Sequence, residues 1–177
     1  MARRPGRASL VWLTALAAGL AAPVAAARQA GDPKPCAAPE HRQFDFWLGE
    51  WGVRTPDGKL AGANTIRRRL NGCVLQEAWS GAGGHHGNSY NIYDASRHRW
   101  HQTWVDDDGT LLQLDGTFAG GRMVLIGETV DSGGKPVKQR ITWEQLDDGK
   151  VRQRWDSSPD GRSWQVVFEG IYSHVRS

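Results

Sequence analysis

Residues 137–156 read VKQRITWEQLDDGKVRQRWD, two runs in which polar and apolar residues alternate, joined by an Asp-Asp-Gly sequence. Ile141 and Trp143 share one side of the first run, and Val151 and Trp155 share one side of the second. Alternation with a period of two is typical of a β-strand with one buried face. Aspartate and glycine tolerate the positive φ angles of tight hairpin turns. The segment therefore predicts an antiparallel hairpin whose tryptophan side faces a core.

The same pattern repeats along the chain up to position 172. The predicted strands are residues 50–55, 63–70, 73–80, 88–93, 98–105, 110–118, 122–130, 137–146, 150–156 and 163–172. The connections after the first strand are too short to hold the crossover helix that parallel strands require. Neighbouring runs should therefore pair antiparallel, and closing the resulting meander removes its two unpaired edges. We predict an all-β fold, a single antiparallel up-and-down β-barrel of about ten strands.

A short helical turn is predicted at residues 40–47, immediately before the first strand. Phe44, Trp47 and Leu48 recur there at helical spacing, and Gly49 follows as a stop signal. An apolar face of this kind can cover one end of a barrel. We therefore expect the turn to cap the barrel.

The N-terminus has the three parts of a secretory signal peptide. Three arginines precede an apolar run at residues 8–22, and residues 25–27 are alanines that offer a cleavage site. The apolar run is shorter than the ~20 residues of a spanning helix, so no membrane span is predicted. We predict that residues 1–27 are removed and that the mature protein is exported, either to a periplasm or to the extracellular space.

Signal-peptide removal makes the protein nearly neutral. The leader holds three arginines and no acidic residue, so the 22 basic and 19 acidic residues of the whole chain become 19 of each. Residues 67–69 are the only cluster of arginines that remains. A near-neutral chain without a basic patch predicts no nucleic-acid partner and no anionic-membrane partner. About 150 residues remain, the size of one domain with its own core.

Two cysteines, Cys36 and Cys73, are present in the chain. A pair of cysteines in an exported protein favours a disulfide. A bond across this separation would add roughly 3 to 4 kcal/mol of stability in the chain-entropy model. Residues 28–38 are polar and proline-rich, which predicts a flexible arm that the disulfide joins to the barrel domain at residues 39–177.

The inward faces of the predicted strands are not purely apolar. Gln102 lies between Trp100 and Trp104 in the alternation, and Glu77 precedes Trp79 on its face. A barrel of eight strands is just filled by its side chains or holds one small ligand, so ten strands leave more room. Aromatic walls with a few polar groups are typical of a ligand pocket. The candidate ligand-binding residues are Glu77, Trp79, Trp100, Gln102, Trp104, Gln139, Trp143, Gln153 and Trp155.

A filled core is the alternative to a cavity. In that arrangement the inward glutamines bond one another or buried water, or lie at the open rim. The same parity argument places Trp164, Val166 and Phe168 on the inward face of the last strand. We predict a cavity for a small apolar or amphipathic molecule, because strand number and inward polarity both favour one.

The sequence FDFWLGEW at residues 44–51 resembles the entry to the first strand of the calycin superfamily, whose lipocalins carry Gly-x-Trp at this place. Gly49 and Trp51 are the matching residues. Residues 44–172 also resemble an uncharacterised family of secreted bacterial calycin-like proteins, a domain of unknown function. The resemblance implies a structural role for Gly49 and Trp51, with Trp51 closing the barrel floor beneath the helical turn. It also implies a late arginine packed on that tryptophan, for which Arg176 is the match.

A haem protein is one alternative function. Nitrobindin-like proteins are ten-stranded calycins that bind haem through a histidine. The histidines available for that role are His85, His86, His98, His101 and His174. No spacing or motif selects one of them, and clustered surface histidines are usually solvated, so neither a haem nor a metal ion is predicted.

An enzyme is the other alternative function. The chain has no Gly-x-Ser-x-Gly elbow, no His-Glu-x-x-His motif and no phosphate-binding loop. Glu77 with Gln102 could act as an acid/base pair, although an inward carboxylate more often contacts an arginine or water. No catalytic residue is predicted. The preferred interpretation is an exported protein that binds a small molecule.

Overall fold

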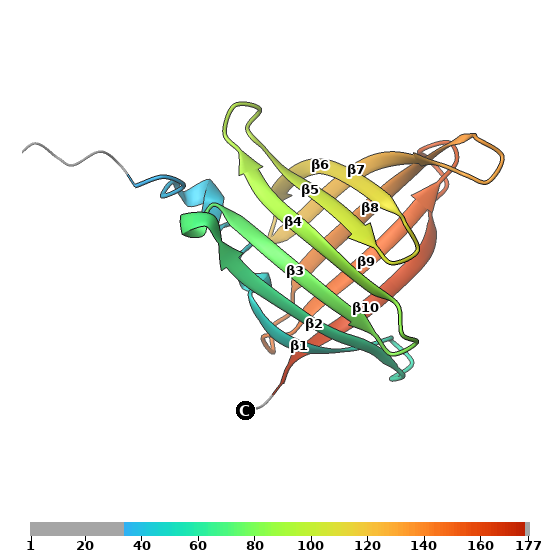
Figure 1. Ribbon diagram of the computed structural model, residues 1–177, viewed down its shortest axis with the longest axis horizontal. Helices are drawn as coiled ribbons and strands as arrows, with labels where there is room; N and C mark the ends of the chain where they lie inside the picture. Colours follow the sequence, from blue (N-terminus) through green and yellow to red (C-terminus); the bar gives the residue numbers. More distant parts are fainter. Residues whose placement is uncertain (1–33, 176–177) are drawn as a thin grey trace, which may run out of the picture. The chain divides into compact units, whose positions relative to one another are not determined.

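Ten β-strands form one closed antiparallel barrel within residues 34–175, the part of the chain that the computed structural model describes (Figure 1). The strands are β1 (Gly49–Arg54), β2 (Leu60–Arg69), β3 (Val74–Gly81), β4 (His86–Asp94), β5 (Arg99–Asp106), β6 (Leu111–Ala119), β7 (Arg122–Val130), β8 (Pro136–Gln145), β9 (Val151–Ser158) and β10 (Gln165–His174). Each strand pairs with its neighbours in sequence, and β1 closes the barrel on β10. The predicted fold is confirmed.

Three sequence predictions fall wholly or partly outside that range. The signal peptide at residues 1–27, residues 28–33 of the predicted arm and Arg176 lie outside the described residues. Between residues 34 and 175, no helix is long and apolar enough to cross a membrane.

The hairpin predicted at residues 137–156 forms between β8 and β9. Trp143 lies opposite Gln153, and Ile141 lies opposite Trp155, so the tryptophan faces of both strands point inward. The turn ends at Gly149, whose φ of 77° is the left-handed conformation that favours glycine. Local alternation and turn chemistry are therefore sufficient to explain this part of the barrel.

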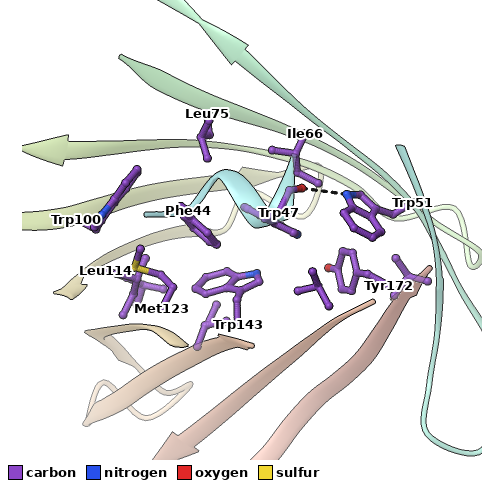
Figure 2. Packing of buried hydrophobic residues seen from close by; sticks show 14 of the residues in the cluster. Phe44, Trp47, Trp51, Ile66, Leu75, Trp100, Leu114, Met123, Trp143 and Tyr172 are labelled. Carbon is purple, nitrogen blue, oxygen red and sulfur yellow. Dashed lines mark hydrogen bonds between the residues drawn. The ribbon is translucent and has the colours of Figure 1, made fainter. Parts of the chain in front are cut away.

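One end of the barrel is closed by two short 3₁₀ helices, η1 (Pro39–Arg42) and η2 (Asp45–Trp47), in place of one continuous turn. The rings of Phe44 and Trp47 are fully buried and stack with their centroids 4.9 Å apart. Trp143 of β8 and Trp100 of β5 meet the Phe44 ring edge-on from the barrel wall. Figure 2 shows this aromatic cluster inside the strands. The prediction that a helical turn caps the barrel is confirmed.

Trp51 of β1 joins the closed end to the last strand. Its Nε1 donates a hydrogen bond to the carbonyl oxygen of Trp47 at 3.0 Å (Figure 2). The His174 ring of β10 stacks on the indole with a centroid separation of 3.7 Å. Gly49 has a φ of 141°, and a Cβ there would lie 2.8 Å from that imidazole. A histidine therefore occupies one face of this tryptophan, and Gly49 provides the space for it.

Cys36 and Cys73 form the predicted disulfide. The bond connects the segment before η1 to the β2–β3 connection, which includes the 3₁₀ turn η3 (Leu70–Gly72). Arg42 makes a second link at the same place, because its Nη2 donates to the carbonyl oxygens of Cys36 at 2.9 Å and Gly72 at 2.7 Å. The closed end is thus tied to the barrel by covalent and polar contacts.

The predicted parity of the last strand is wrong in its first half. Trp164 precedes β10 and lies outside the barrel, with the Arg140 guanidinium 4.1 Å from its ring centroid. Val166 is half exposed. The β9–β10 register shifts between Val166 and Phe168, which turns Phe168 inward. A β-bulge inserts one extra residue, so the side chains that precede it in the strand point to the face opposite to the one expected from simple alternation.

Candidate functional site

The barrel is filled at the closed end and hollow at the other. A cavity of about 240 Å³ lies inside it. Its lining includes His85, from the β3–β4 connection, and Val167, near the start of β10. In an up-and-down barrel these positions lie at the end opposite η1 and η2. The residues that line the cavity are Glu77, Trp79, His85, Gln102, Trp104, Leu112, Ile141, Gln153, Trp155, Val167, Phe168 and Tyr172.

The cavity has an aromatic mouth and a polar base. Trp79, Trp104 and Trp155 are partly exposed and form much of the mouth. The polar side chains that line the cavity deeper in the barrel are buried, with Glu77 only 4% and Tyr172 only 1% exposed. Buried Leu112 and Ile141 complete the inner wall. A molecule entering the cavity would therefore contact apolar rings first and polar groups last.

A chain of hydrogen bonds crosses the base from β2 to β5. Asn64 Nδ2 donates to Glu77 Oε1 at 2.7 Å, and Ser89 Oγ donates to Glu77 Oε2 at 2.6 Å. Asn91 Nδ2 donates to Ser89 Oγ at 2.9 Å. Gln102 Nε2 in turn donates to Asn91 Oδ1 at 2.8 Å. All five side chains are buried, so the network holds Glu77 in one orientation.

A second branch of the network runs to β9 and β10. Asn64 Nδ2 also lies 3.4 Å from the hydroxyl oxygen of Tyr172. The Tyr172 hydroxyl donates a hydrogen bond to Gln153 Oε1. The polar groups at the base of the cavity are therefore linked through residues behind them into one network from six strands. Glu77 is the only carboxylate among the cavity-lining residues.

Burial has the largest effect on the pKa of Glu77. It raises the pKa of the carboxyl group from 4.5 to about 7, against the opposing effect of the hydrogen bonds from Ser89 and Asn64. Burial also raises the pKa of Tyr172 well above its ordinary value, and the nearby charge of Glu77 adds to that effect. No lysine or arginine within residues 34–175 lines the cavity. Glu77 therefore changes charge near neutral pH without a lysine or arginine partner from the cavity wall.

Glu77→Gln is expected to raise the free energy of unfolding by about 3 kcal/mol at pH 8 and to change it little at pH 4. The pKa of Glu77 is about 7 in the folded protein and about 4.5 when unfolded, so the unfolded chain loses its proton first. The wild type therefore loses stability as pH rises from about 4.5 to about 7. Urea denaturation at pH 4, 6 and 8 measures this, with Glu128→Gln on the outer face as control. Parallel pH profiles for wild type and Glu77→Gln would contradict the burial argument.

Six of the nine predicted ligand-binding residues line the cavity: Glu77, Trp79, Gln102, Trp104, Gln153 and Trp155. Trp100 and Trp143 lie instead in the apolar cluster of the closed end, where both contact Phe44. Gln139 does not line the cavity but supports a residue that does, because its Oε1 accepts a hydrogen bond from Trp155 Nε1 at 2.7 Å. The structure thus assigns Trp100 and Trp143 to the core and Gln139 to the support of Trp155.

Sequence reasoning missed Asn64, Ser89, Asn91 and Tyr172. The inward face of β4 contains small and polar residues, and an alternation argument reads such a face as solvent-exposed. Tyr172 shares the parity of Phe168, which the sequence analysis placed on the inward face, but it was not named among the candidates. The signal that could have identified Asn64 is its place in β2, two residues before Ile66 on an inward face.

The side chain of Trp104 packs against a glycine of the adjacent strand, β4. A Cβ at Gly87 would lie 2.1 Å from the Trp104 ring. The indole Nε1 also donates to Asp106 Oδ2 at 3.1 Å. Glycine at position 87 therefore allows this ring to approach β4 closely at the mouth.

The five histidines considered as haem or metal ligands are dispersed. His85 lines the mouth of the cavity and contacts Asp107 at 2.9 Å and Asp108 at 3.2 Å. Potential ligand atoms of these three residues lie within 4.8 Å of one another, so they could hold a cation, although all three side chains are substantially exposed. His101 bonds Asp115 and His174 stacks on Trp51, whereas His86 and His98 are exposed.

Comparison with known proteins provides no relative whose ligand could be transferred, because no family model and no curated protein matches the chain. The cavity itself is therefore the basis for a function. Its small volume, aromatic mouth and buried polar base can enclose an apolar body and hydrogen-bond one polar group at its end.

Proposed function

We propose that this protein is an exported binding protein for a small, largely apolar molecule that enters the open end of a calycin-type barrel. The observation that carries the proposal is the unequal filling of the barrel. The closed end is packed with aromatic rings, whereas the other end contains a cavity with an aromatic mouth and a polar base. Apolar walls with a few oriented polar groups are the usual composition of a ligand site.

The cavity volume limits the size of the ligand. An apolar cavity of about 150 Å³ is enough to hold benzene, and drug-sized ligands occupy roughly 300 to 1,000 Å³. The 240 Å³ cavity lies between these sizes. We therefore infer a ligand with about one ring and a short substituent. Burial of such a ring against several aromatic side chains supplies most of the binding free energy.

Three observations support the export and calycin parts of the proposal. The leader-like pattern at residues 1–27 is typical of secreted proteins. The Cys36–Cys73 disulfide is of a kind that persists in oxidising compartments. Gly49 and Trp51 match the calycin Gly-x-Trp motif, and both lie where the first strand leaves the closed end.

An enzyme that uses Glu77 is the second candidate. A buried carboxyl group with a pKa of about 7 in a cavity suits a general acid or base. The two candidates differ in what Glu77→Gln does to a substance that is found to bind: an enzyme loses turnover, whereas a binding protein converts nothing before or after the substitution. Product analysis by mass spectrometry after prolonged incubation distinguishes them.

Leu112→Phe is expected to weaken binding of the neutral probe 2-phenylethanol about tenfold or more, because the larger side chain fills part of the cavity. Leu112 lines the cavity and is 2% exposed. Its neighbour Leu111 is 58% exposed on the same strand, so Leu111→Phe is the matched control and should bind as the wild type does. Titration followed by the tryptophan indole N–H resonances in NMR spectra measures both.

The position of the responding resonances provides a further check. Indole signals of Trp79, Trp104 and Trp155 should shift on titration, and those of the closed end should not. Equal affinity of the two leucine variants, or shifts confined to the closed end, would contradict binding in this cavity. Thermal unfolding of each variant establishes that the substituted protein is folded.

A further inference from the structure

Glu77 is a carboxylate that lacks a basic partner in an otherwise uncharged pocket base. The other buried cavity-lining residues are glutamine, tyrosine and aliphatic side chains. It accepts hydrogen bonds from two neutral groups, Asn64 Nδ2 and Ser89 Oγ. A buried carboxylate is costly unless it is paired or protonated. The pocket therefore provides a negative charge without its complement.

Resting on the proposed function, we infer that the ligand is a small amine whose ammonium group binds Glu77 at the base of the cavity while its apolar body lies among the aromatic side chains. The class is a compact primary amine with one ring, since the cavity of 240 Å³ has no room for more than a short substituent beside it.

The acceptor positions at the base of the cavity suit a ligand that donates hydrogen bonds. An ionised carboxylate offers about four lone-pair positions, of which Asn64 and Ser89 use two. Asn64 Oδ1, in the side chain bonded to Glu77, is buried and accepts no hydrogen bond. An ammonium group provides three N–H donors and no acceptor. The two unfilled lone-pair positions of Glu77 are acceptors, so they match an ammonium group and would be left unpaired by a ligand without donors.

The aromatic side chains favour a cation as well. Trp79, Trp104, Trp155, Phe168 and Tyr172 all line the cavity. The face of an aromatic ring attracts a cation within about 6 Å, and tryptophan does so best. These rings therefore enclose the apolar body of the ligand and also attract a protonated amine that passes between them toward Glu77.

The charge near the mouth of the cavity also favours a cationic ligand. Asp106, Asp107 and Asp108 belong to the end of β5 and the hairpin that follows, and His85 of the cavity mouth lies beside them. A negative mouth raises the local concentration of cations and repels anions. An anionic ligand of the same size would pass the negative charge beside His85 and meet Glu77 at the base.

Binding of an ammonium group should depend on the ionisation of Glu77. The flanking strands β2 and β4 present neutral Asn64 and Ser89 to it, Tyr172 of β10 stays protonated because its pKa is raised, and His85 lies at the mouth. With a pKa of about 7, Glu77 is largely protonated at pH 5.5 and ionised at pH 8.5. An alkylamine with a pKa near the lysine value of ~10.4 is cationic throughout this range.

The test compares three probes of one shape: 2-phenylethylamine, 2-phenylethanol and phenylacetate, titrated into the mature protein by NMR. We expect the amine to bind about tenfold or more tightly than the alcohol at pH 8.5, and phenylacetate to bind weakest. Amine affinity should fall about 30-fold from pH 8.5 to pH 5.5, as the ionised fraction of Glu77 falls, while alcohol affinity changes little. Glu77→Gln should remove the preference for the amine.

Glu128→Gln is the matched control, because it makes the same chemical change on the outer face of β7, where Glu128 pairs with Lys138. It should leave the preference for the amine intact. Equal affinity for amine and alcohol, or tighter binding of phenylacetate, would overturn the amine inference while leaving a small-molecule site in place. If none of the three probes shifts the indole resonances of the cavity, both the amine inference and the proposed function are overturned.

Discussion

Trp143→Ala is expected to lower the free energy of unfolding by about 3 to 5 kcal/mol, the range typical of removing a large aromatic side chain from a packed core. Trp143 is fully buried, and its ring contacts Phe44 and Trp47 with centroid separations of 5.1 and 5.3 Å (Figure 2). The substitution would leave a void between the wall and the closed end that neighbouring rings cannot fill. Guanidinium denaturation followed by circular dichroism measures the loss.

Two further variants separate packing from other effects. Trp164→Ala removes the same side chain from the outer face, where it is partly exposed beside Arg140, and should cost about 1 kcal/mol or less. Trp143→Phe keeps most of the packing and removes an indole N–H that has no hydrogen-bond partner. It should therefore cost much less than alanine. A loss below about 1 kcal/mol for Trp143→Ala would contradict a tightly packed closed end.

Replacing Cys36 and Cys73 together with serine is expected to lower the free energy of unfolding by about 4 kcal/mol in the chain-entropy model. The disulfide closes a loop with a sequence separation of 37, and it ties the segment before η1 to the β2–β3 connection. Without it the unfolded chain gains freedom that folding must remove. Guanidinium denaturation of the double variant, compared with the wild type with and without reductant, measures the effect.

The reduced wild type should match the double variant, and the cavity should still bind its probe because it lies at the opposite end of the barrel. Arg42 still links the carbonyls of residues 36 and 72 when the disulfide is absent. A loss under about 1 kcal/mol would therefore mean that the Arg42 contacts alone hold the closed end. A loss of probe binding would mean that the two ends of the barrel are coupled.

The two ends of the barrel have different physical roles. The closed end contains the dry aromatic packing and the disulfide, and both expected stability losses arise there. The open end contains a buried carboxyl group and an unfilled space, which reduce stability. Violations of core-packing rules are expected at functional sites, where binding compensates for them. This contrast is consistent with the proposal that the ligand binds at the open end.

Position along a strand explains why only part of the candidate site was predictable. Trp100 and Trp104 lie on the same face of β5, four residues apart, or about 13 Å along the strand. Trp100 belongs to the filled end, whereas Trp104 lines the mouth. Alternation tells which face a residue occupies, but it contains no information about depth along the barrel axis. Depth follows from strand stagger and closure, which depend on contacts between distant strands.

The polar network was predictable only in part, for a related reason. Glu77, Ser89 and Asn64 belong to three strands, and nothing in the sequence around any of them indicates the other two. Their meeting depends on the β2–β3 and β3–β4 registers, which place Ile66 and Ser89 opposite Glu77. A shift of one residue in either register would turn those side chains to the outer face.

Local sequence was sufficient for the strands, most of the hairpins, the helical turn and the pairing of the two cysteines, because each depends on residues close in the chain or on a single pair. Barrel closure was expected from the short connections, but the bulge before Phe168 and the division into a filled and a hollow end required the tertiary structure. They arise from pairings between distant segments, whose registers fix how deep each inward side chain lies.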